Sequence, residues 1–368
     1  MNIGIPKERR PSEFRVGLSP AGVEILKHQG HTIFVEHEAG LGAGFSDQEY
    51  ERAGARIVYA PDEVFGRADL LLKFARPLKE ELEWMRAGTV VAGLLHLASS
   101  RQDKIEILVK NKITAIAYEQ IEEADGTTPV KKPLAQIGGR MTAQIAAHFM
   151  QNYKGGKGIL LSGIAGVPPA EVVIIGAGVA GTSATQAFLG NGAHVTVLDS
   201  DLRALQRLEE RFPQAVTMLA TPKNIARTCA FADVVVGAVL VPGERSPIVL
   251  KREIVKKMKP RSLIIDMSID QGGCVETSRP TTHEQCTFIE EGVIHYCVPN
   301  IPAAVARTAT HAFVNAAMPY ILELANKGCR QAIAENKALE KAVCTIEGQL
   351  LHLARLNGQV GGGVYGLD

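Results

Sequence analysis

Short apolar runs alternate with amphipathic segments along most of the chain, separated by polar and glycine-bearing stretches. In the first third, these runs predict six β-strands, at residues 2–5, 32–36, 56–58, 69–74, 89–95 and 114–118. Helix signals fall between them. Ser19 with Pro20 predicts a helix start, Gly30 predicts its end, and Ser46 with Glu49 makes a capping-box pattern. Regular alternation of strands and helices predicts an α/β unit.

A second unit of the same kind begins near residue 172. Residues 172–175 form the β-branched apolar run that is typical of a buried parallel strand, and Gly176, Gly178 and Gly181 follow at once in the spacing G-x-G-x-x-G. After a helical stretch, the next apolar run ends at Asp199, which lies about 20 residues beyond the glycines. Strand, glycine turn, helix and acidic residue together predict a dinucleotide-binding unit.

The glycine spacing has a physical reason. Gly176 permits a tight turn, Gly178 lets a pyrophosphate approach the backbone, and Gly181 lets the helix pack against the strand. The carboxylate of Asp199 is placed to accept hydrogen bonds from a ribose 2′-hydroxyl and to repel a 2′-phosphate. NAD is therefore expected as the cofactor in preference to NADP.

The remaining patterns predict how the two units are connected. They indicate a helical bridge at 132–153, further buried strands at 232–240 and 261–270, and long helices at 308–327 and 337–356. We predict two Rossmann-like doubly wound domains. Residues 132–306 form the NAD-binding domain, and residues 1–131 and 307–368 form a discontinuous substrate domain completed by the C-terminal helices. An oligomer face on those helices is the alternative, and the glycine-rich end, 357–368, is expected to be mobile.

Composition narrows the function classes. Forty basic and 39 acidic residues in a chain of 368 give a net charge of +1 without a basic block, so nucleic acid and anionic membrane surfaces are not expected partners. The six cysteines show neither CxxC nor metal-ligand spacing, which indicates reduced thiols and no metal. Without a signal-peptide pattern or an apolar run near the ~20 residues of a membrane helix, a soluble cytoplasmic protein is expected.

Several motifs resemble one family in the same order. They are Gly4–Glu8 with Glu13–Val16, Leu94–Ala98, the glycine segment up to Gly181, Gly237–Gly243, Asp270–Cys274, Ser278–Thr282 and Tyr296–Asn300. In these motifs the chain is similar over nearly its whole length to the alanine dehydrogenases, relatives of the NAD-binding domain of proton-translocating transhydrogenase. The resemblance implies reversible, NAD-dependent oxidative deamination of L-alanine to pyruvate and ammonium. It also implies a homo-oligomer, commonly a hexamer.

The resemblance also assigns roles to individual residues. Arg15 corresponds to the arginine that binds the substrate carboxylate, and a planar guanidinium suits that task. His96 corresponds to the catalytic histidine, whose pKa range suits proton transfer, and Asp270 to the catalytic aspartate. Asn300 matches a residue near the nicotinamide. The backbone around Val239 and Leu240 is expected to line the cofactor.

Two positions depart from the family pattern. The family carries Lys-x-Lys-Glu-Pro, and its second lysine helps to hold the substrate, whereas this chain reads Lys73-Phe-Ala-Arg-Pro77 with Ala75 in the lysine position. Lys73 lies on the same face of a strand as Ala75 and is the candidate replacement, and Arg76 faces the other way unless the strand bends. Ala135 replaces a serine that contacts the cofactor.

Three hypotheses therefore stand. The first is an NAD-dependent dehydrogenase of alanine or a related small amino acid, supported by Arg15, His96 and Asp270 together. The second is a catalytically weak NAD-binding homologue, supported by Ala75 and Ala135. The third is a detached transhydrogenase NAD domain, which the motifs around His96 and Asp270 disfavour.

Overall fold

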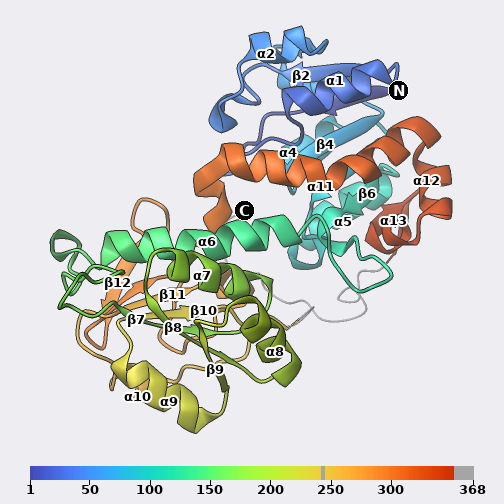
Figure 1. Ribbon diagram of the computed structural model, residues 1–368. Helices are drawn as coiled ribbons and strands as arrows, with labels where there is room; N and C mark the ends of the chain where they lie inside the picture. Colours follow the sequence, from blue (N-terminus) through green and yellow to red (C-terminus); the bar gives the residue numbers. More distant parts are fainter. Residues whose placement is uncertain (242–244, 352–368) are drawn as a thin grey trace. The chain divides into compact units, whose positions relative to one another are not determined.

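The computed structural model describes residues 1–241 and 245–351, and the chain divides into two compact units. Unit 1 comprises Met1–Leu134 and the chain from Ala303 onward, and unit 2 comprises Ala135–Pro302. Both are α/β units built around a mainly parallel sheet (Figure 1). The prediction of two Rossmann-like domains is confirmed, with the first one interrupted by the second.

The sheet of unit 1 has the strand order β15-β14-β6-β5-β4-β1-β2-β3. Its strands are β1 (Asn2–Ile5), β2 (Thr32–Glu36), β3 (Arg56–Val58), β4 (Leu70–Ala75), β5 (Val90–Leu94), β6 (Thr114–Ala117), β14 (Val343–Ile346) and β15 (Gln349–Leu350). β1 to β6 are parallel, and the chain reverses its direction of winding between β1 and β4. Ligands of doubly wound sheets bind beyond the carboxyl ends of the strands at such a point.

Helices cover both faces of this sheet. They are α1 (Pro20–His28), α2 (Asp47–Arg52), α3 (Pro61–Arg67), α4 (Lys79–Trp84), α5 (Gln102–Lys110), α11 (Ala306–Lys327), α12 (Cys329–Glu335) and α13 (Lys337–Ala342). Successive residues of a strand belong to two separate hydrophobic cores. Ile33 and Val35 lie in the same core as Phe313 of α11, whereas Phe34 lies in the same core as Phe65 of α3. This period of two places one apolar face of the sheet under each helical layer.

The predicted helix at 337–356 is wrong beyond Ala342. There the chain enters β14, which pairs antiparallel with β6, and Thr345 donates a hydrogen bond from its hydroxyl to the Ile113 carbonyl at 2.9 Å. The segment is rich in β-branched residues, and its Val343 and Cys344 are buried, so a strand at the edge of an existing sheet is the more favourable state. The end of the predicted helix and the glycine-rich 357–368 lie outside the described residues.

Unit 2 repeats the same winding. Its sheet has the order β12-β13-β11-β10-β7-β8-β9, formed by β7 (Glu171–Ile175), β8 (His194–Asp199), β9 (Val216–Leu219), β10 (Val234–Gly237), β11 (Leu263–Asp266), β12 (Thr287–Glu290) and β13 (Val293–Tyr296). Only β12, at the edge, is antiparallel. The strand segments 232–240 and 261–270 predicted from the sequence are shorter in the structure, where β10 ends at Gly237 and β11 ends at Asp266. The residues that follow leave the sheet, and Val239 and Ser268 of the two loops bind each other through hydrogen bonds.

The helices of unit 2 are α6 (Lys132–Phe149), α7 (Val179–Gly190), α8 (Leu202–Arg211), α9 (Pro222–Phe231) and α10 (Arg252–Val255). Helix α6 begins at the end of unit 1 and runs on into unit 2, as the predicted helical bridge required. Across residues 1–241 and 245–351, none of the helices has the length and apolar character needed to cross a bilayer. The same residues hold no group of three His, Cys, Asp or Glu side chains suited to a metal ion.

Candidate functional site

The glycine turn after β7 is shaped by backbone contacts that leave no room for side chains. Gly176 has a φ of +110°, and a Cβ there would lie 2.3 Å from the Ala238 carbonyl oxygen. A Cβ at Gly181 would lie 1.8 Å from the Gly176 carbonyl oxygen, because α7 packs directly on the turn. A Cβ at Gly178 would meet nothing within 4 Å. The turn is therefore tight at its first and third glycines and open at the second, beside the N-terminus of α7, as a dinucleotide pyrophosphate requires.

Asp199 ends β8 beside this turn. Its Oδ2 accepts a hydrogen bond from the Ala177 N–H at 2.6 Å, and its Oδ1 accepts one from the Asp201 N–H at 2.8 Å. The carboxylate is half-buried and is held by backbone donors next to the glycines. The structure thus brings together Gly176, Gly178, Gly181 and Asp199, the four residues predicted for the dinucleotide site.

The loop after β10 is joined to the loop after β11. The Val239 N–H donates to Ser268 Oγ at 3.0 Å, and the Ser268 hydroxyl donates to the Val239 carbonyl at 2.8 Å. A second serine, Ser246, also donates to that carbonyl, at 3.0 Å. Leu240, the next residue, is half exposed. Val239 and Leu240 therefore lie at the carboxyl end of the sheet, where cofactor contacts were predicted.

Asp266, at the end of β11, organises the loop that carries Asp270. It is fully buried and accepts hydrogen bonds from the Ser268 N–H at 3.0 Å, the Cys274 N–H at 3.1 Å and the Val275 N–H at 3.3 Å. Burial raises the pKa of Asp266, while these donors act against the shift. Sequence analysis missed this residue, although an acid that ends a buried apolar strand is a recognisable signal.

Asp270 and Asn300 meet in unit 2. The Asn300 N–H lies 3.2 Å from both carboxylate oxygens of Asp270, and the Asn300 backbone has a φ of +56°. Asp270 is exposed in the short turn Ile269–Gln271, and Asn300 is half-buried. Two residues that lie 30 positions apart in sequence, and that were predicted separately, are therefore neighbours.

His96 follows β5 in unit 1 and has a left-handed backbone, with φ 43° and ψ 42°. This conformation is strained for a residue with a side chain, and Glu119 after β6 stabilises it. Glu119 accepts hydrogen bonds from the N–H groups of Leu95 at 3.1 Å and His96 at 2.6 Å. Glu119 Oε1 also lies 3.8 Å from His96 Nδ1, and the imidazole is 56% exposed. The ring is thus accessible to a ligand and has a carboxylate beside it. Glu119 was not predicted as a site residue.

Arg15 is buried and bound on two sides. Its Nε and Nη2 donate to the two carboxylate oxygens of Glu13 at 2.6 and 2.5 Å, and its guanidinium carbon lies 3.9 Å from the centre of the Phe74 ring. Glu13 was not singled out from the sequence either. These contacts fix the plane of the guanidinium beside the end of β4, and a substrate carboxylate would have to share it with Glu13.

Lys73 has a different environment from the one predicted for it. Its ammonium is fully buried, 2.9 Å from Glu81 Oε1 and 3.1 Å from Glu8 Oε2. Burial lowers the pKa of Lys73, but the two carboxylates outweigh burial and raise it, and burial raises the pKa of Glu8 to about 7. β4 also changes its register with β5 between Leu72 and Ala75, so simple alternation of faces does not carry over from Lys73 to Ala75. The contacts of Lys73 are those of a buried ion pair and do not support its predicted role in substrate binding.

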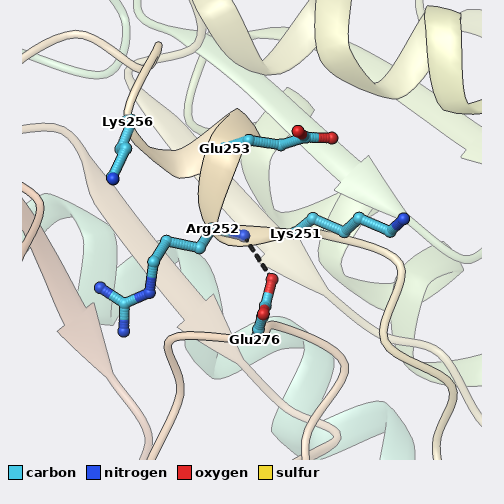
Figure 2. A pocket seen from close by; sticks show the side chains of 5 residues that line it. All are labelled: Lys251, Arg252, Glu253, Lys256 and Glu276. Carbon is cyan, nitrogen blue, oxygen red and sulfur yellow. Dashed lines mark hydrogen bonds between the residues drawn. The ribbon is translucent and has the colours of Figure 1, made fainter.

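One surface hollow of unit 2 lies apart from all predicted site residues. It measures about 340 Å³ and is lined by Lys251, Arg252, Glu253, Lys256 and Glu276 (Figure 2). The Arg252 N–H donates to Glu276 Oε2 at 2.8 Å, which closes the start of the short helix α10. All five lining side chains are lysine, arginine or glutamate at the surface, so the hollow resembles a solvated turn.

Two family models match consecutive parts of the sequence. The model described as "Alanine dehydrogenase/PNT, N-terminal domain" matches residues 4–138, and the model described as "Alanine dehydrogenase/PNT, C-terminal domain" matches residues 142–353. The alanine dehydrogenase of Methanococcus maripaludis is 46% identical over 356 residues, which cover 96% of this chain and 95% of the relative. That of Bacillus subtilis is 44% identical over 357 residues, covering 96% and 93%.

Solved structures of related proteins match the fold of this chain. An L-alanine dehydrogenase matches with a TM-score of 0.93 and 42% identity, covering 96% of this chain and 97% of the other. A transhydrogenase from Sinorhizobium meliloti matches with a TM-score of 0.83 and 26% identity, covering 96% and 99%. The resemblance seen in the sequence motifs is confirmed: the chain belongs to the alanine dehydrogenase/PNT family and is an oxidoreductase.

Proposed function

We propose that the protein catalyses the reversible, NAD-dependent oxidative deamination of L-alanine to pyruvate and ammonium. In the forward direction, L-alanine, NAD⁺ and water give pyruvate, ammonium, NADH and one proton. The observation that carries the proposal is the pairing of an accessible histidine with a carboxylate at the carboxyl ends of β5 and β6, where His96 lies 3.8 Å from Glu119. The family membership and the relatives named alanine dehydrogenase support the choice of alanine.

The cofactor assignment depends on the fit of unit 2 to a dinucleotide. The open backbone at Gly178 and the close packing at Gly176 and Gly181 suit a pyrophosphate, and the carboxylate of Asp199 favours a free ribose 2′-hydroxyl over a phosphate. NAD, when bound, would supply the acceptor for the hydride that leaves the substrate Cα. Gly176, Gly178, Gly181 and Asp199 would hold it, together with the backbone around Val239 and Leu240.

The other residues would move protons and balance charge. Arg15 would bind the substrate carboxylate, because a planar guanidinium fixed by Glu13 and Phe74 is already oriented. His96 would accept a proton from the attacking water as the iminium is hydrolysed and return it to the departing amine. Asp270, positioned by the Asn300 N–H, would stabilise the iminium charge and orient water.

The charges at the end of β4 favour a second candidate function. Ala75 supplies no charge, and the ammonium of Lys73 is buried against Glu8 and Glu81, so it does not replace one. The protein would then bind NAD with little turnover, or act on a related small amino acid. A panel of L-amino acids and 2-oxo acids, assayed by NADH absorbance beside NADH binding by calorimetry, separates these outcomes. Turnover with alanine above all others supports the proposal, and tight binding without turnover on any of them supports the second candidate.

We further propose a cytoplasmic homohexamer. The six cysteines are free thiols, as a reducing compartment allows, and family resemblance supports the assembly number. Light scattering coupled to size-exclusion chromatography measures the mass directly: six times the 39.5 kDa of the chain is expected, and a monomer would contradict the proposal.

A further inference from the structure

A cation at the end of β4 has no role in the reaction described so far. Arg76 follows β4 directly and is half-buried, whereas Lys73, three residues earlier, is fully buried with Glu8 and Glu81. Ala75 between them contributes no charge. Arg76 therefore places a positive charge that is partly exposed to solvent at the carboxyl end of β4.

The guanidinium of Arg76 is connected to the turn that holds His96. Arg76 Nη1 donates to Ser99 Oγ at 3.1 Å, and the Ser99 hydroxyl donates to the His96 carbonyl at 2.9 Å. One serine thus links the side chain of Arg76 to the backbone of His96. Since β4 and β5 are neighbouring parallel strands, Arg76 and His96 both lie beyond the carboxyl ends of these strands, on the same side of the sheet.

The backbone of Arg76 is held as well. Arg10 donates from Nε to the Arg76 carbonyl at 3.2 Å. The register of β4 against β5 shifts between Leu72 and Ala75, so the chain has left regular alternation before it reaches Arg76. This bend allows Arg76 to turn toward the His96 side, which an unbent strand would prevent.

We propose that Arg76 binds the carboxylate of the substrate beside His96, as a second cation in addition to Arg15. This inference rests on the proposed function. The Nε and Nη2 groups of Arg15 already donate to Glu13. A second guanidinium therefore strengthens the attraction for an anion at the carboxyl ends of β4 and β5. Arg76 is thereby a specificity-determining residue that favours 2-amino and 2-oxo acids over their uncharged amides and esters.

The test measures pyruvate binding to the full chain saturated with NADH, without ammonium so that no amination occurs. Arg76→Gln is expected to raise the pyruvate Kd by roughly tenfold or more, because one charge-assisted contact is lost, and to leave the NADH Kd within about twofold. Arg76→Lys keeps the charge but loses the planar guanidinium, so its pyruvate Kd is expected to lie between those of the wild type and Arg76→Gln. Pyruvamide, which has no carboxylate, is expected to bind both proteins equally weakly.

Arg86→Gln is the matched control. Arg86 pairs with Asp69 at 2.9 Å near the opposite, amino-terminal edge of the same strands, and its side chain is 51% exposed. Its pyruvate Kd is expected to stay at the wild-type value. A pyruvate Kd within about twofold of wild type for Arg76→Gln would overturn the inference and leave the proposed function standing. Equal losses of pyruvate and NADH binding, with a lowered melting midpoint, would also overturn it by showing a structural role. If the wild-type protein binds no 2-oxo acid at all, the proposed function itself fails.

Discussion

At the scale of single residues, the candidate site depends on carboxylates that hold other groups in place. Glu119 stabilises the left-handed backbone of His96, Glu13 orients Arg15, and Asp266 anchors the loop of Asp270. Sequence analysis found the second member of each pair but not the first. Glu119 carries no local signal, because it meets His96, 23 residues earlier in the sequence, only once β5 and β6 lie side by side. Glu13 and Asp266 lie close in sequence to the residues they hold, but the sequence does not show that their carboxylates bind those neighbours.

His96→Ala should remove activity while leaving the cofactor site intact. General acid–base catalysis commonly contributes on the order of a hundredfold or more to the rate, so kcat with alanine should fall at least that far. The NADH Kd, measured by calorimetry, should stay within about twofold. His28→Ala is the control, because His28 is 78% exposed on α1 and has no predicted role. Loss of NADH binding together with activity would show that His96 acts in folding.

Lys73→Met tests the reassignment of Lys73 from substrate contact to buried ion pair. It leaves Glu8 and Glu81 buried without their shared cation, which should lower the free energy of unfolding by about 3–5 kcal/mol. Urea denaturation measures this. Lys79→Met, which removes an exposed lysine 3.8 Å from Asp103, should cost less than about 0.5 kcal/mol. A stable Lys73→Met protein with a strongly raised KM for alanine would instead restore the substrate role.

At the scale of elements, sequence patterns correctly predicted the strands and helix starts that depend on interactions between residues close in sequence. The β-branched run before Gly176 and the capping box at Ser46 describe interactions within a few residues, and both are present in the structure. The strand β14 was missed because its sequence, Val343–Ile346, follows a helical pattern and gains its stability from β6, more than 220 residues earlier. The bend at the end of β4 likewise follows from its pairing with β5 and leaves no periodic signal.

The glycine turn allows an element-scale test. Gly181→Ala places a methyl group 1.8 Å from the Gly176 carbonyl, so α7 must move away from β7 and the pyrophosphate cradle must open. The NADH Kd should rise by roughly tenfold or more. Gly190→Ala, at the other end of the same helix, meets nothing within 4 Å and should leave the NADH Kd unchanged. Equal effects of the two substitutions would mean that the turn does not hold the dinucleotide.

At the scale of the whole molecule, the same winding occurs twice. Each unit has six parallel strands in an equivalent order, and each collects its polar residues beyond the carboxyl ends. Within residues 1–241 and 245–351, the glycine turn lies in unit 2, and the exposed His96, linked to Arg76 through Ser99, lies in unit 1. This division of chemistry supports a protein in which one unit binds the cofactor and the other binds the substrate.

In the proposed reaction, hydride passes from the Cα of L-alanine to NAD. Incubation of the protein with NAD and L-alanine deuterated at Cα, followed by mass spectrometry of the NADH formed, measures that transfer directly. If the proposed reaction occurs, the NADH carries one deuterium and appears in a 1:1 ratio with pyruvate. NADH without deuterium, or no NADH while the protein binds NAD tightly, would contradict this hydride transfer.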